Sequence, residues 1–400
     1  MKVLLVNKLY APDIGGGAEL VLADLAAGLQ ARGSEVLVAT TTDGDQVVEG
    51  EVAGVPVTRL PLRNIYWHHG GAQRGALQRM MWHARDAHNP AMGEALGRVI
   101  RRFDPDVISF HNLAGFSTAA WDAAFAQRKP AVQVLHDYYN LCPRSQFFRD
   151  GKNCDTPCTS CRLFRRGRAA QSNGLKGVVG VSHAVLDAHV RNGLFAEVGV
   201  RRVINNAQRF GAMTARDYPS TAVTYGFIGT LAEWKGIRQL LDAFRSVAEQ
   251  ADAPALRLLV AGDGEPAYVD ELRATYASDR IEFLGRVKPA SFYESIDVLV
   301  VPSIWHDPLP GVVFESLLFG VPVIGARRGG IPEMVNDRVN GLLYDPDTAG
   351  ALAGCIRQMA LTSGLVREFG ARARAGSSHF ADTGRVVTEH LAVFDAVAGA

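Results

Sequence analysis

A buried strand, a glycine-rich loop and a helix follow one another at the start of this chain, and that order constrains the fold more than any other feature. The strand is expected at Lys2–Asn7, the loop is Gly15-Gly16-Gly17, and the helix runs over residues 18–32 before Gly33 ends it. A second strand is expected at Glu35–Thr41. This order opens a doubly wound α/β domain with a parallel sheet.

The same order restarts in the second half of the chain. A strand at Thr224–Gly229 and a helix at Ile237–Glu249 precede a strand at Leu256–Ala261, which runs into Gly262-Asp263-Gly264. A chain of 400 residues is also too long for one ordinary core. Further strands are expected at Val107–Phe110, Ala131–Leu135, Lys176–Val181, Val200–Ile204, Ile281–Leu284, Val298–Val300 and Pro322–Ile324.

Two doubly wound, Rossmann-like domains facing a cleft are therefore expected, with their ligand sites at the carboxyl ends of the strands. Residues 207–222 are polar and loop-like, so the boundary is placed there. We predict a first domain at 1–206, a second at 207–382, and a terminal segment at 383–400 whose helix, Arg385–Val397, packs back on the first domain.

Composition excludes several classes of protein. Hydrophobic residues make up 48% and charged residues 21%, which excludes a disordered chain. No apolar run reaches the length of a transmembrane helix, and the apolar stretch near Met1 is too short for a signal peptide. We expect a cytoplasmic protein, or one at the inner face of the plasma membrane.

The charges divide unevenly between the halves. Residues 1–210 carry 25 Lys and Arg against 18 Asp and Glu, whereas residues 211–400 carry 17 against 23. A basic first half suits an anionic lipid or a phosphorylated substrate, and uneven surface decoration is the alternative.

Two carboxylates flank a predicted helix start in the second half. Asp307 lies in a loop, and Glu315 lies inside the first turns of a helix that begins near Gly311. A helix N-terminus offers unpaired N–H groups and a positive dipole, which suit a diphosphate or sugar oxygens. Both carboxylates could instead be solvated charges, but Glu315 stands among apolar residues, where a solvated charge is uncomfortable.

These residues resemble the signature of the retaining nucleotide-sugar glycosyltransferases of the GT-B fold, the "glycosyl transferases group 1". That signature is Glu-x7-Glu, Gly-x-Pro-Val and Gly-Gly-x-x-Glu, and this chain has Asp307-x7-Glu315, Gly320-Val321-Pro322-Val323 and Gly329-Gly330-Ile331-Pro332-Glu333. Further pieces resemble the family in the same order along nearly the whole chain: Gly15–Glu19, Asp106–His111, Val178–Ser182, Gly229-Thr230-Leu231 with Lys235-Gly236, Gly262–Gly264 and Phe283–Gly285.

The resemblance implies a hexosyltransferase that moves a sugar, with retention, from a nucleotide-diphosphate donor to a lipid-linked or saccharide acceptor, in polysaccharide or glycolipid assembly. Lys235 would bind the diphosphate, Glu315 the ribose and Asp307 the transferred sugar, while His111 would stand beside the reacting carbon. The donor site would also include Gly16, Gly17, Gly229, Thr230, Leu284, Arg286, Leu309, Gly311 and Val312. No cofactor is implied for catalysis.

Two positions depart from the family pattern. Asp307 replaces the first Glu, and Thr230 stands where the family has Arg, which removes a cation from the diphosphate site. Two alternatives therefore stay open. One is a non-catalytic GT-B-like metal-binding assembly subunit, and the other is a nucleotide-sugar epimerase.

Four cysteines gather in one short stretch of the first half. Cys142, Cys154, Cys158 and Cys161 follow His136-Asp137-Tyr138, and only Cys355 lies elsewhere. Clustered thiols in a cytosolic protein indicate a metal site, and four thiolates suit structural zinc best, with an iron–sulfur cluster second. Two disulfides are the alternative in an exported protein. The polar loop 143–153 is expected to depend on the metal for its order, and a subset of the family resembles this chain here.

Basic and aromatic residues interleave on either side of this cluster. Residues 66–69 are Tyr-Trp-His-His, Arg79 and Arg85 flank Met80-Met81-Trp82, and residues 162–168 hold four arginines. The pattern suits an anionic membrane surface or a lipid-diphosphate acceptor. A solvated loop is the alternative, and no nucleic-acid-binding motif accompanies the basic run.

Overall fold

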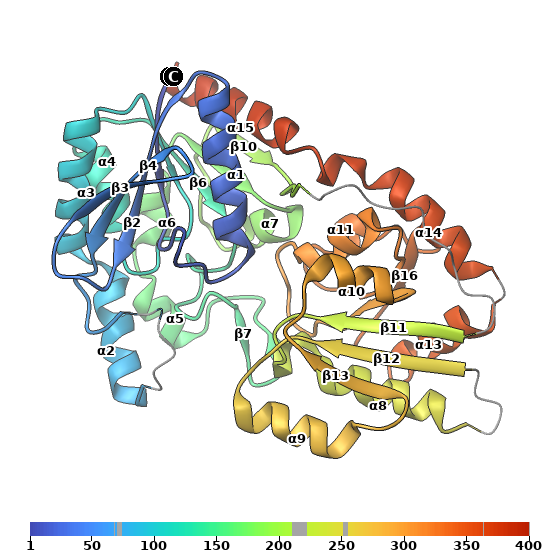
Figure 1. Ribbon diagram of the computed structural model, residues 1–400. Coiled ribbons are helices and arrows are strands. Elements are labelled where there is room, and N and C mark those ends of the chain that lie inside the picture. The colour runs from blue at the N-terminus through green and yellow to red at the C-terminus, as the bar shows by residue number, and fades with distance from the viewer. Residues whose placement is uncertain (68, 70–73, 210–221, 251–254, 363, 400) are drawn as a thin grey trace. The chain divides into compact units, whose positions relative to one another are not determined.

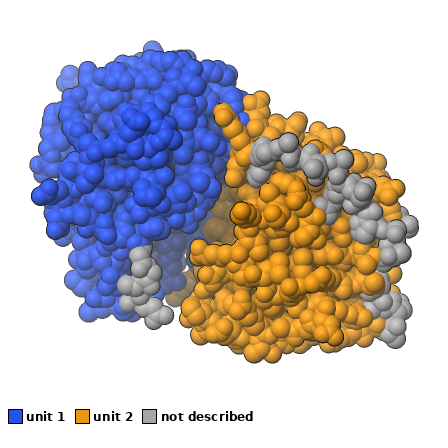
Figure 2. Space-filling view, in the orientation of Figure 1, with its two compact units in different colours: residues 1–147, 154–207, 383–400 blue, residues 148–153, 208–382 orange. Residues whose placement is uncertain are grey.

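The computed structural model describes residues 1–67, 69, 74–209, 222–250, 255–362 and 364–399. The chain forms two compact units (Figure 2). Unit 1 comprises residues 1–147, 154–207 and 383–400, and unit 2 comprises residues 148–153 and 208–382. Most of the polar segment 207–222, on which the predicted boundary rests, lies outside the described residues.

Unit 1 is built on an eight-stranded sheet in the order β10-β9-β6-β5-β1-β2-β4-β3. All neighbours pair in parallel except β3, which runs antiparallel to β4. The strands are β1 Lys2–Val6, β2 Glu35–Thr42, β3 Val48–Val52, β4 Val55–Pro61, β5 Val107–Phe110, β6 Ala131–Leu135, β9 Gly177–Gly180 and β10 Val200–Val203.

Helices of unit 1 pack against this sheet in two pairs, α1 with α15 and α3 with α4 (Figure 1). Gly28 of α1 allows a close approach, because a Cβ there would lie 2.3 Å from Cγ2 of Val387 in α15. The helices are α1 Gly17–Ala31, α2 Ala76–Ala87, α3 Pro90–Phe103, α4 Ala119–Phe125, α5 Thr159–Phe164, α6 Arg168–Ser172, α7 His183–Arg191 and α15 Thr383–Ala398.

Unit 2 holds a six-stranded parallel sheet in the order β13-β12-β11-β14-β15-β16. Its strands are β11 Ala222–Ile228, β12 Ala255–Ala261, β13 Ile281–Gly285, β14 Val298–Val301, β15 Val323–Ala326 and β16 Gly341–Tyr344. Its helices are η1 Glu233–Lys235, α8 Ile237–Ala248, α9 Pro266–Tyr276, α10 Pro289–Ser295, α11 Gly311–Leu318, α12 Ile331–Met334, α13 Ala351–Leu361, α14 Leu365–Gly376 and η2 Ser378–Phe380. The predicted α/β class, with two parallel-sheet domains, is confirmed.

Each sheet has one point at which the chain reverses its direction of winding. In unit 1, β2 lies on one side of β1 and β5 on the other. In unit 2, β12 and β13 lie on one side of β11, and β14 lies on the other. Loops that follow the two strands at such a point diverge and leave a crevice for a ligand. The residues after β1 and β5, and those after β11 and β14, are therefore the places to search for a site.

A two-stranded hairpin of β7 Phe148–Arg149 and β8 Lys152–Asn153 lies inside the polar cysteine loop. Asp150 and Gly151 form its turn, with φ of 51° and 73°, as a tight type I′ hairpin turn requires. The sequence assigns residues 148–153 to the first domain, whereas the structure groups them with unit 2. The reason is local, because Asn153 hydrogen-bonds to backbone of unit 2.

No helix in the described part of the chain is long and apolar enough to cross a membrane.

Candidate active site

An ion pair joins the two loops at the crevice of unit 2. The ammonium Nζ of Lys235, after β11, lies 2.5 Å from Oδ2 of Asp307, after β14. The Asp307 side chain is 9% exposed and that of Lys235 is 26% exposed, so solvent still reaches the pair from the lysine side. The same ammonium lies 5.4 Å from the centre of the Trp305 ring, within cation–π range. The structure thus brings together two residues that stand 72 positions apart in the sequence.

Glycines let these loops approach so closely. Gly236, directly after Lys235, has φ of 72°, and a Cβ there would lie 1.9 Å from the carbonyl oxygen of Pro302. Gly329 has φ of 54°, and its Cβ would lie 2.0 Å from the carbonyl oxygen of Asp307. Gly330 N–H donates to that carbonyl at 2.8 Å. The Gly-Gly pair therefore fixes the backbone that carries Asp307.

Glu315 is held in a buried setting by one phenol. The hydroxyl of Tyr293, in α10, donates to Oε2 of Glu315, in α11, at 2.7 Å. Burial raises the pKa of Glu315, and the hydrogen bond from Tyr293 lowers it in part. Burial also raises the pKa of Tyr293, with the nearby Glu315 carboxylate adding to the effect. Glu315 is therefore a largely buried, hydrogen-bonded carboxyl and not a solvated surface charge.

The start of α11 carries three other predicted residues. Pro310 is the residue before the helix, Gly311 and Val312 form its first turn, and Leu309 is buried just upstream at 8% exposure. A Cβ on Gly311 would lie 3.2 Å from Oε1 of Glu315, so this end of the helix packs tightly around the carboxylate. The first turn of the helix and the Glu315 carboxylate are therefore adjacent.

A cavity of about 320 Å³ opens where β11, β12 and β13 end. Gly229, Thr230, Gly262, Asp263 and Arg286 are among the residues that line it. A Cβ on Gly262 would lie 1.8 Å from the carbonyl oxygen of Gly229, so only glycine allows these loops to meet. Nε of Arg286 lies 3.3 Å from Oδ2 of Asp263.

Leu284 lies apart from this cavity. With Phe283 it lines a second cavity, of about 570 Å³, whose other walls include Ile281 and Glu282. The structure therefore brings together Gly229, Thr230 and Arg286 and leaves Leu284 in a neighbouring hollow.

The crevice of unit 1 holds His111, which directly follows β5. The ring is 4% exposed, and its Nδ1 lies 2.9 Å from Nε2 of His136, so one imidazole donates to the other. Nε2 of His111 lies 3.1 Å from Oγ of Ser109. Burial lowers the pKa of His111 well below the usual range and that of His136 to about 3. Both rings are neutral at pH 7, so they can hold or pass a proton but carry no charge.

The glycine loop lies beyond β1 in the same unit. Gly17 begins α1, and the N–H of Gly16 donates to Oε2 of Glu19 at 2.8 Å. The loops after β1 and β5 are tied together, because the N–H of Lys8 donates to the carbonyl of Asn112 at 2.8 Å. The residues predicted in unit 1 therefore lie at the reversal point of its sheet.

Comparison with known proteins decides the family. The sequence profile described as "Glycosyltransferase Family 4" matches residues 15–206, and that described as "Glycosyl transferases group 1" matches residues 222–361. The crystal structure of Anabaena HepE in complex with UDP and glucose superimposes with a TM-score of 0.71 at 22% identity, over 99% of each chain. The chain belongs to the GT-B glycosyltransferases.

Two bacterial proteins are among the sequence relatives of this glycosyltransferase. It is 27% identical to a 42.6 kDa protein of the cps region of Klebsiella pneumoniae, over 84% of this chain and 87% of that protein. It is 31% identical to the lipopolysaccharide core biosynthesis glycosyltransferase LpsE of Rhizobium meliloti, over 41% of this chain and 48% of LpsE.

Cys161 lies at the centre of the contacts among the clustered cysteines of this glycosyltransferase. Sγ of Cys158 lies 3.5 Å from Sγ of Cys161. A hydrogen bond from Cys161 lowers the pKa of Cys142 to about 6, and the same bond raises the pKa of Cys161. Among the described residues, no three histidine, cysteine or carboxylate side chains are arranged to hold one metal ion. The thiols suit zinc by their chemistry, and Cys161 contacts both Cys142 and Cys158.

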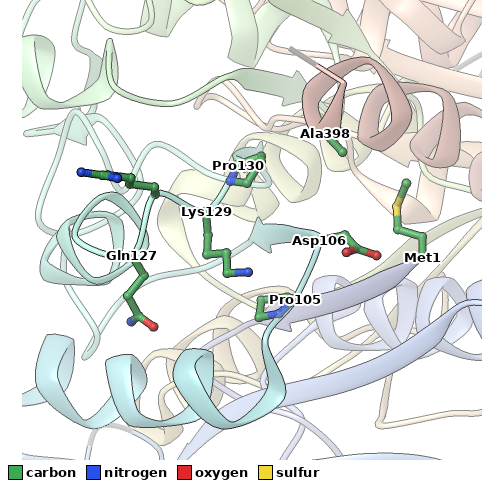
Figure 3. Close-up of a pocket in the computed structure, with 8 residues that line it drawn as sticks. Met1, Pro105, Asp106, Gln127, Lys129, Pro130 and Ala398 are labelled. Atoms are coloured by element: carbon green, nitrogen blue, oxygen red, sulfur yellow. The ribbon is translucent and has the colours of Figure 1, made fainter.

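Another cavity of the glycosyltransferase lies at the wrong end of the sheet for a substrate. It has a volume of about 450 Å³ and is lined by Met1, Pro105, Asp106, Lys129 and Pro130, among others (Figure 3). These residues stand just before β1, β5 and β6, at the amino ends of the strands. Ligands of such sheets bind at the carboxyl ends, so we assign this cavity no role in the transfer.

Three residues around the site were not assigned a role from the sequence. Tyr293 holds Glu315, His136 contacts His111, and Asn153 contacts the loop before Asp307. Tyr293 gives no signal, because an aromatic residue in an amphipathic helix is ordinary core. His136 could have been found, since it follows β6 just as His111 follows β5.

Proposed function

We propose that this chain transfers a hexose from a nucleotide-diphosphate sugar, with retention of anomeric configuration, to a lipid-linked or polysaccharide acceptor. The observation that carries the proposal is the Lys235–Asp307 pair at the reversal point of the unit 2 sheet. That pair offers a cation for a diphosphate next to a carboxylate for sugar hydroxyls, with Glu315 at the start of the next helix.

The proposed chemistry needs positive charge where the diphosphate leaves. As the bond to the sugar breaks, negative charge grows on the diphosphate, and preorganised donors stabilise that charge. Lys235 is the proposed point charge, and backbone N–H groups of Gly311 and Val312 are the proposed helix-terminal donors. Thr230 supplies no charge, so Arg286, on the cavity after β13, is proposed as the second cation.

His111 is the proposed group beside the reacting carbon. Its ring is neutral and is oriented on both nitrogens by Ser109 and His136. To hydrogen-bond a sugar hydroxyl, the ring would exchange the Ser109 hydroxyl at Nε2 for the sugar hydroxyl. Because the ring is neutral, it would not repel a developing positive charge at the anomeric carbon. We propose this positioning role for His111 and backbone approach to the phosphates for Gly16 and Gly17.

The similar proteins support the choice of substrates. HepE was crystallised with UDP and glucose and with UDP-glucose, which favours a uridine donor. LpsE is named for lipopolysaccharide core biosynthesis, and the Klebsiella relative is named for the cps region. Both names favour a saccharide acceptor of the cell surface.

A donor screen tests this function. UDP-, GDP- and ADP-sugars would be added singly, and the melting temperature and release of nucleoside diphosphate would be measured, because a bound ligand stabilises the fold. Proton NMR of the product's anomeric proton would then report retention or inversion. Donor binding without turnover on any acceptor extract would favour the non-catalytic assembly subunit. Conversion of the donor sugar without an acceptor would favour the epimerase.

A basic and apolar surface on unit 1 supports a lipid-linked acceptor. Leu77, Met80 and Met81 of α2 and Leu163 of α5 are 48–69% exposed, and Arg79, Arg85, Arg162 and Arg166 lie among them. The only acidic residue in α2 or α5 is Asp86, which is fully buried. Exposed apolar side chains interspersed with arginines along these segments suit an anionic bilayer surface.

We expect cosedimentation with phosphatidylglycerol-containing vesicles and not with neutral phosphatidylcholine vesicles. The double substitution Met80→Ser/Met81→Ser should weaken this binding, because it removes apolar area and leaves the charges. Equal binding to neutral vesicles, or unchanged binding of the variant, would remove the membrane surface from the proposal.

A structural zinc ion held by Cys142, Cys154, Cys158 and Cys161 remains a proposal, with an iron–sulfur cluster second. Its support is the four-thiol spacing and the contacts of Cys161 with Cys142 and Cys158, with Arg165 adding positive charge near Cys142. Elemental analysis should find about one zinc per chain, and Cys158→Ser should lose it. Metal-free protein, or two disulfides under reducing conditions, would eliminate the site.

A further inference from the structure

One side chain of the β7–β8 hairpin makes two hydrogen bonds to the loop that carries Asp307. Nδ2 of Asn153 donates to the carbonyl oxygen of Ile304 at 2.8 Å. The backbone N–H of His306 donates to Oδ1 of Asn153 at 2.7 Å. Both ends of the amide are therefore used, and the two bonds bracket Trp305.

The bonded residues, Ile304 and His306, belong to the loop that carries Asp307 and contacts Lys235. The N–H of Asp307 donates to the carbonyl of Trp305 at 2.9 Å. The turn that carries the carboxylate therefore begins at Trp305, between the two residues that Asn153 binds. The Trp305 ring faces the Lys235 ammonium. The N–H of Ile304 donates to the carbonyl of Trp234, the residue before Lys235, at 3.1 Å. The Asn153 amide and the Trp234 carbonyl thus both bond to the backbone of this loop.

The hairpin holds Asn153 in a fixed place. Asn153 pairs with Phe148 across the two strands, and the N–H of Cys154 donates to the carbonyl of Phe147 at 2.9 Å, which closes the base of the hairpin. Phe147 and Phe148 are 4% and 8% exposed, so the start of β7 is buried.

We infer that Asn153 is a positioning residue for the Lys235–Asp307 pair, and hence for the donor diphosphate and sugar. The inference rests on the proposed function where it concerns the donor. The inferred role of Asn153 is indirect. It fixes the backbone of residues 304–306, and that backbone fixes the distance between the ammonium and the carboxylate.

Asn153→Ala removes both bonds and tests the inference. Lys152→Ala, in the same strand but exposed, is the matched control. We expect a donor KM for UDP-glucose about tenfold higher in Asn153→Ala, with an unchanged acceptor KM, because two hydrogen bonds to the loop are lost. Lys152→Ala should behave as the wild type. A melting temperature measured for each variant separates this effect from loss of the fold.

Lys235 also gives a readout that needs no donor. Acetylation by an N-hydroxysuccinimide ester reports how firmly an ammonium is held, and mass spectrometry measures its rate at one residue. The rate at Lys235 should rise in Asn153→Ala and not in Lys152→Ala, together with faster deuterium exchange at the His306 amide.

The second variant, Asn153→Asp, keeps the acceptor for His306 but turns a carboxylate toward the carbonyl of Ile304. It should be at least as impaired as Asn153→Ala. An unchanged Lys235 rate in a folded Asn153→Ala would overturn the inference. If the wild-type protein binds no nucleotide sugar, the proposed function is wrong. The acetylation rate at Lys235 still tests the role of Asn153 in that case.

Discussion

The proposed donor site rests on the ion pair between Lys235 and Asp307. The ammonium and carboxylate neutralise each other at 2.5 Å, and the pair is partly shielded from water. A diphosphate would compete with Asp307 for the same ammonium. On the proposed function, Asp307 would hold Lys235 in place for the more highly charged diphosphate.

Substitution of Lys235 tests that reading. Lys235→Ala should weaken binding of nucleoside diphosphate by about 2–3 kcal/mol, because a partly desolvated charged contact is lost. Isothermal titration with UDP would measure it. The control is Arg238→Ala in the following helix α8. It removes an arginine that is paired with Glu271 of α9. Equal affinity in wild type and Lys235→Ala would take Lys235 out of the site.

Glu315 should impose a pH dependence on donor binding. Its carboxylate form is the better acceptor for ribose hydroxyls, so binding should weaken as the pH falls through its raised pKa. Tyr293→Phe removes the hydrogen bond that lowers this pKa, so the pKa rises further and binding should fail at a higher pH. UDP affinity measured from pH 5 to 8 checks this. Tyr276→Phe, which loses a hydrogen bond to Asp242, should keep the wild-type profile.

Single residues differ in how far sequence predicts them. Lys235, Asp307 and Glu315 could be named because their spacing around a helix start resembles a family signature. Asn153 could not, because a polar residue after Asp-Gly predicts a turn and not a contact 151 positions away. The pairing of the cysteines was equally out of reach, since spacing along the chain does not fix distances between sulfur atoms.

Elements of this fold are shaped by glycines, and two of these glycines form a matched pair. Gly329 and Gly350 both have positive φ, at 54° and 75°, but only at Gly329 would a Cβ strike backbone, the carbonyl of Asp307. At Gly350 nothing lies within 4 Å. The difference between the two substitutions isolates the close contact from the conformational strain.

We expect Gly350→Ala to lower the free energy of unfolding by about 1–2 kcal/mol and to leave UDP binding intact. Gly329→Ala should cost more stability and should also weaken UDP binding, because the backbone of Asp307 must move. Urea unfolding and titration with UDP measure both quantities. If the two variants bind UDP equally well, the Gly329 contact does not position Asp307.

Strands were predicted where apolar runs are continuous. Val107–Phe110 and Ala131–Leu135 have the expected bounds, since each strand is buried throughout its length. The β3–β4 hairpin was not predicted, because β3 is exposed over most of its residues and lacks an apolar run. The β7–β8 hairpin was missed for a similar reason, as its four strand residues hold only one apolar side chain.

At the scale of the whole molecule, buried neutral histidines should make unit 1 sensitive to acid. His111, His136, His189 and His390 all have pKa values lowered mainly by burial, that of His390 to about 4. Between pH 6.5 and 4 the unfolded chain binds more protons than the folded one. Stability from these groups is therefore full above pH 6.5 and is lost as the pH falls, by up to about 1.4 kcal/mol per pH unit for each group.

His390→Gln removes one of these groups from helix α15. Denaturant unfolding at pH 7 and at pH 4.5 should show a smaller loss of stability in the variant than in the wild type, by roughly 2–3 kcal/mol. Parallel losses in the two proteins would show that His390 is protonated in the folded state or titrates alike in both states.

Unit 1 is assembled from stretches at both ends of the chain, and this has a consequence for synthesis. Helix α15 packs on α1 at Gly28, yet it is translated after all of unit 2. At 5–20 residues per second, a ribosome needs roughly 10–35 s to travel from residue 207 to residue 383. During that interval the face of α1 that α15 later covers is exposed on the nascent chain, whereas unit 2 can fold as it is completed. Unit 1 is therefore begun first and completed last. We expect a chaperone to bind the nascent chain at the exposed face of α1.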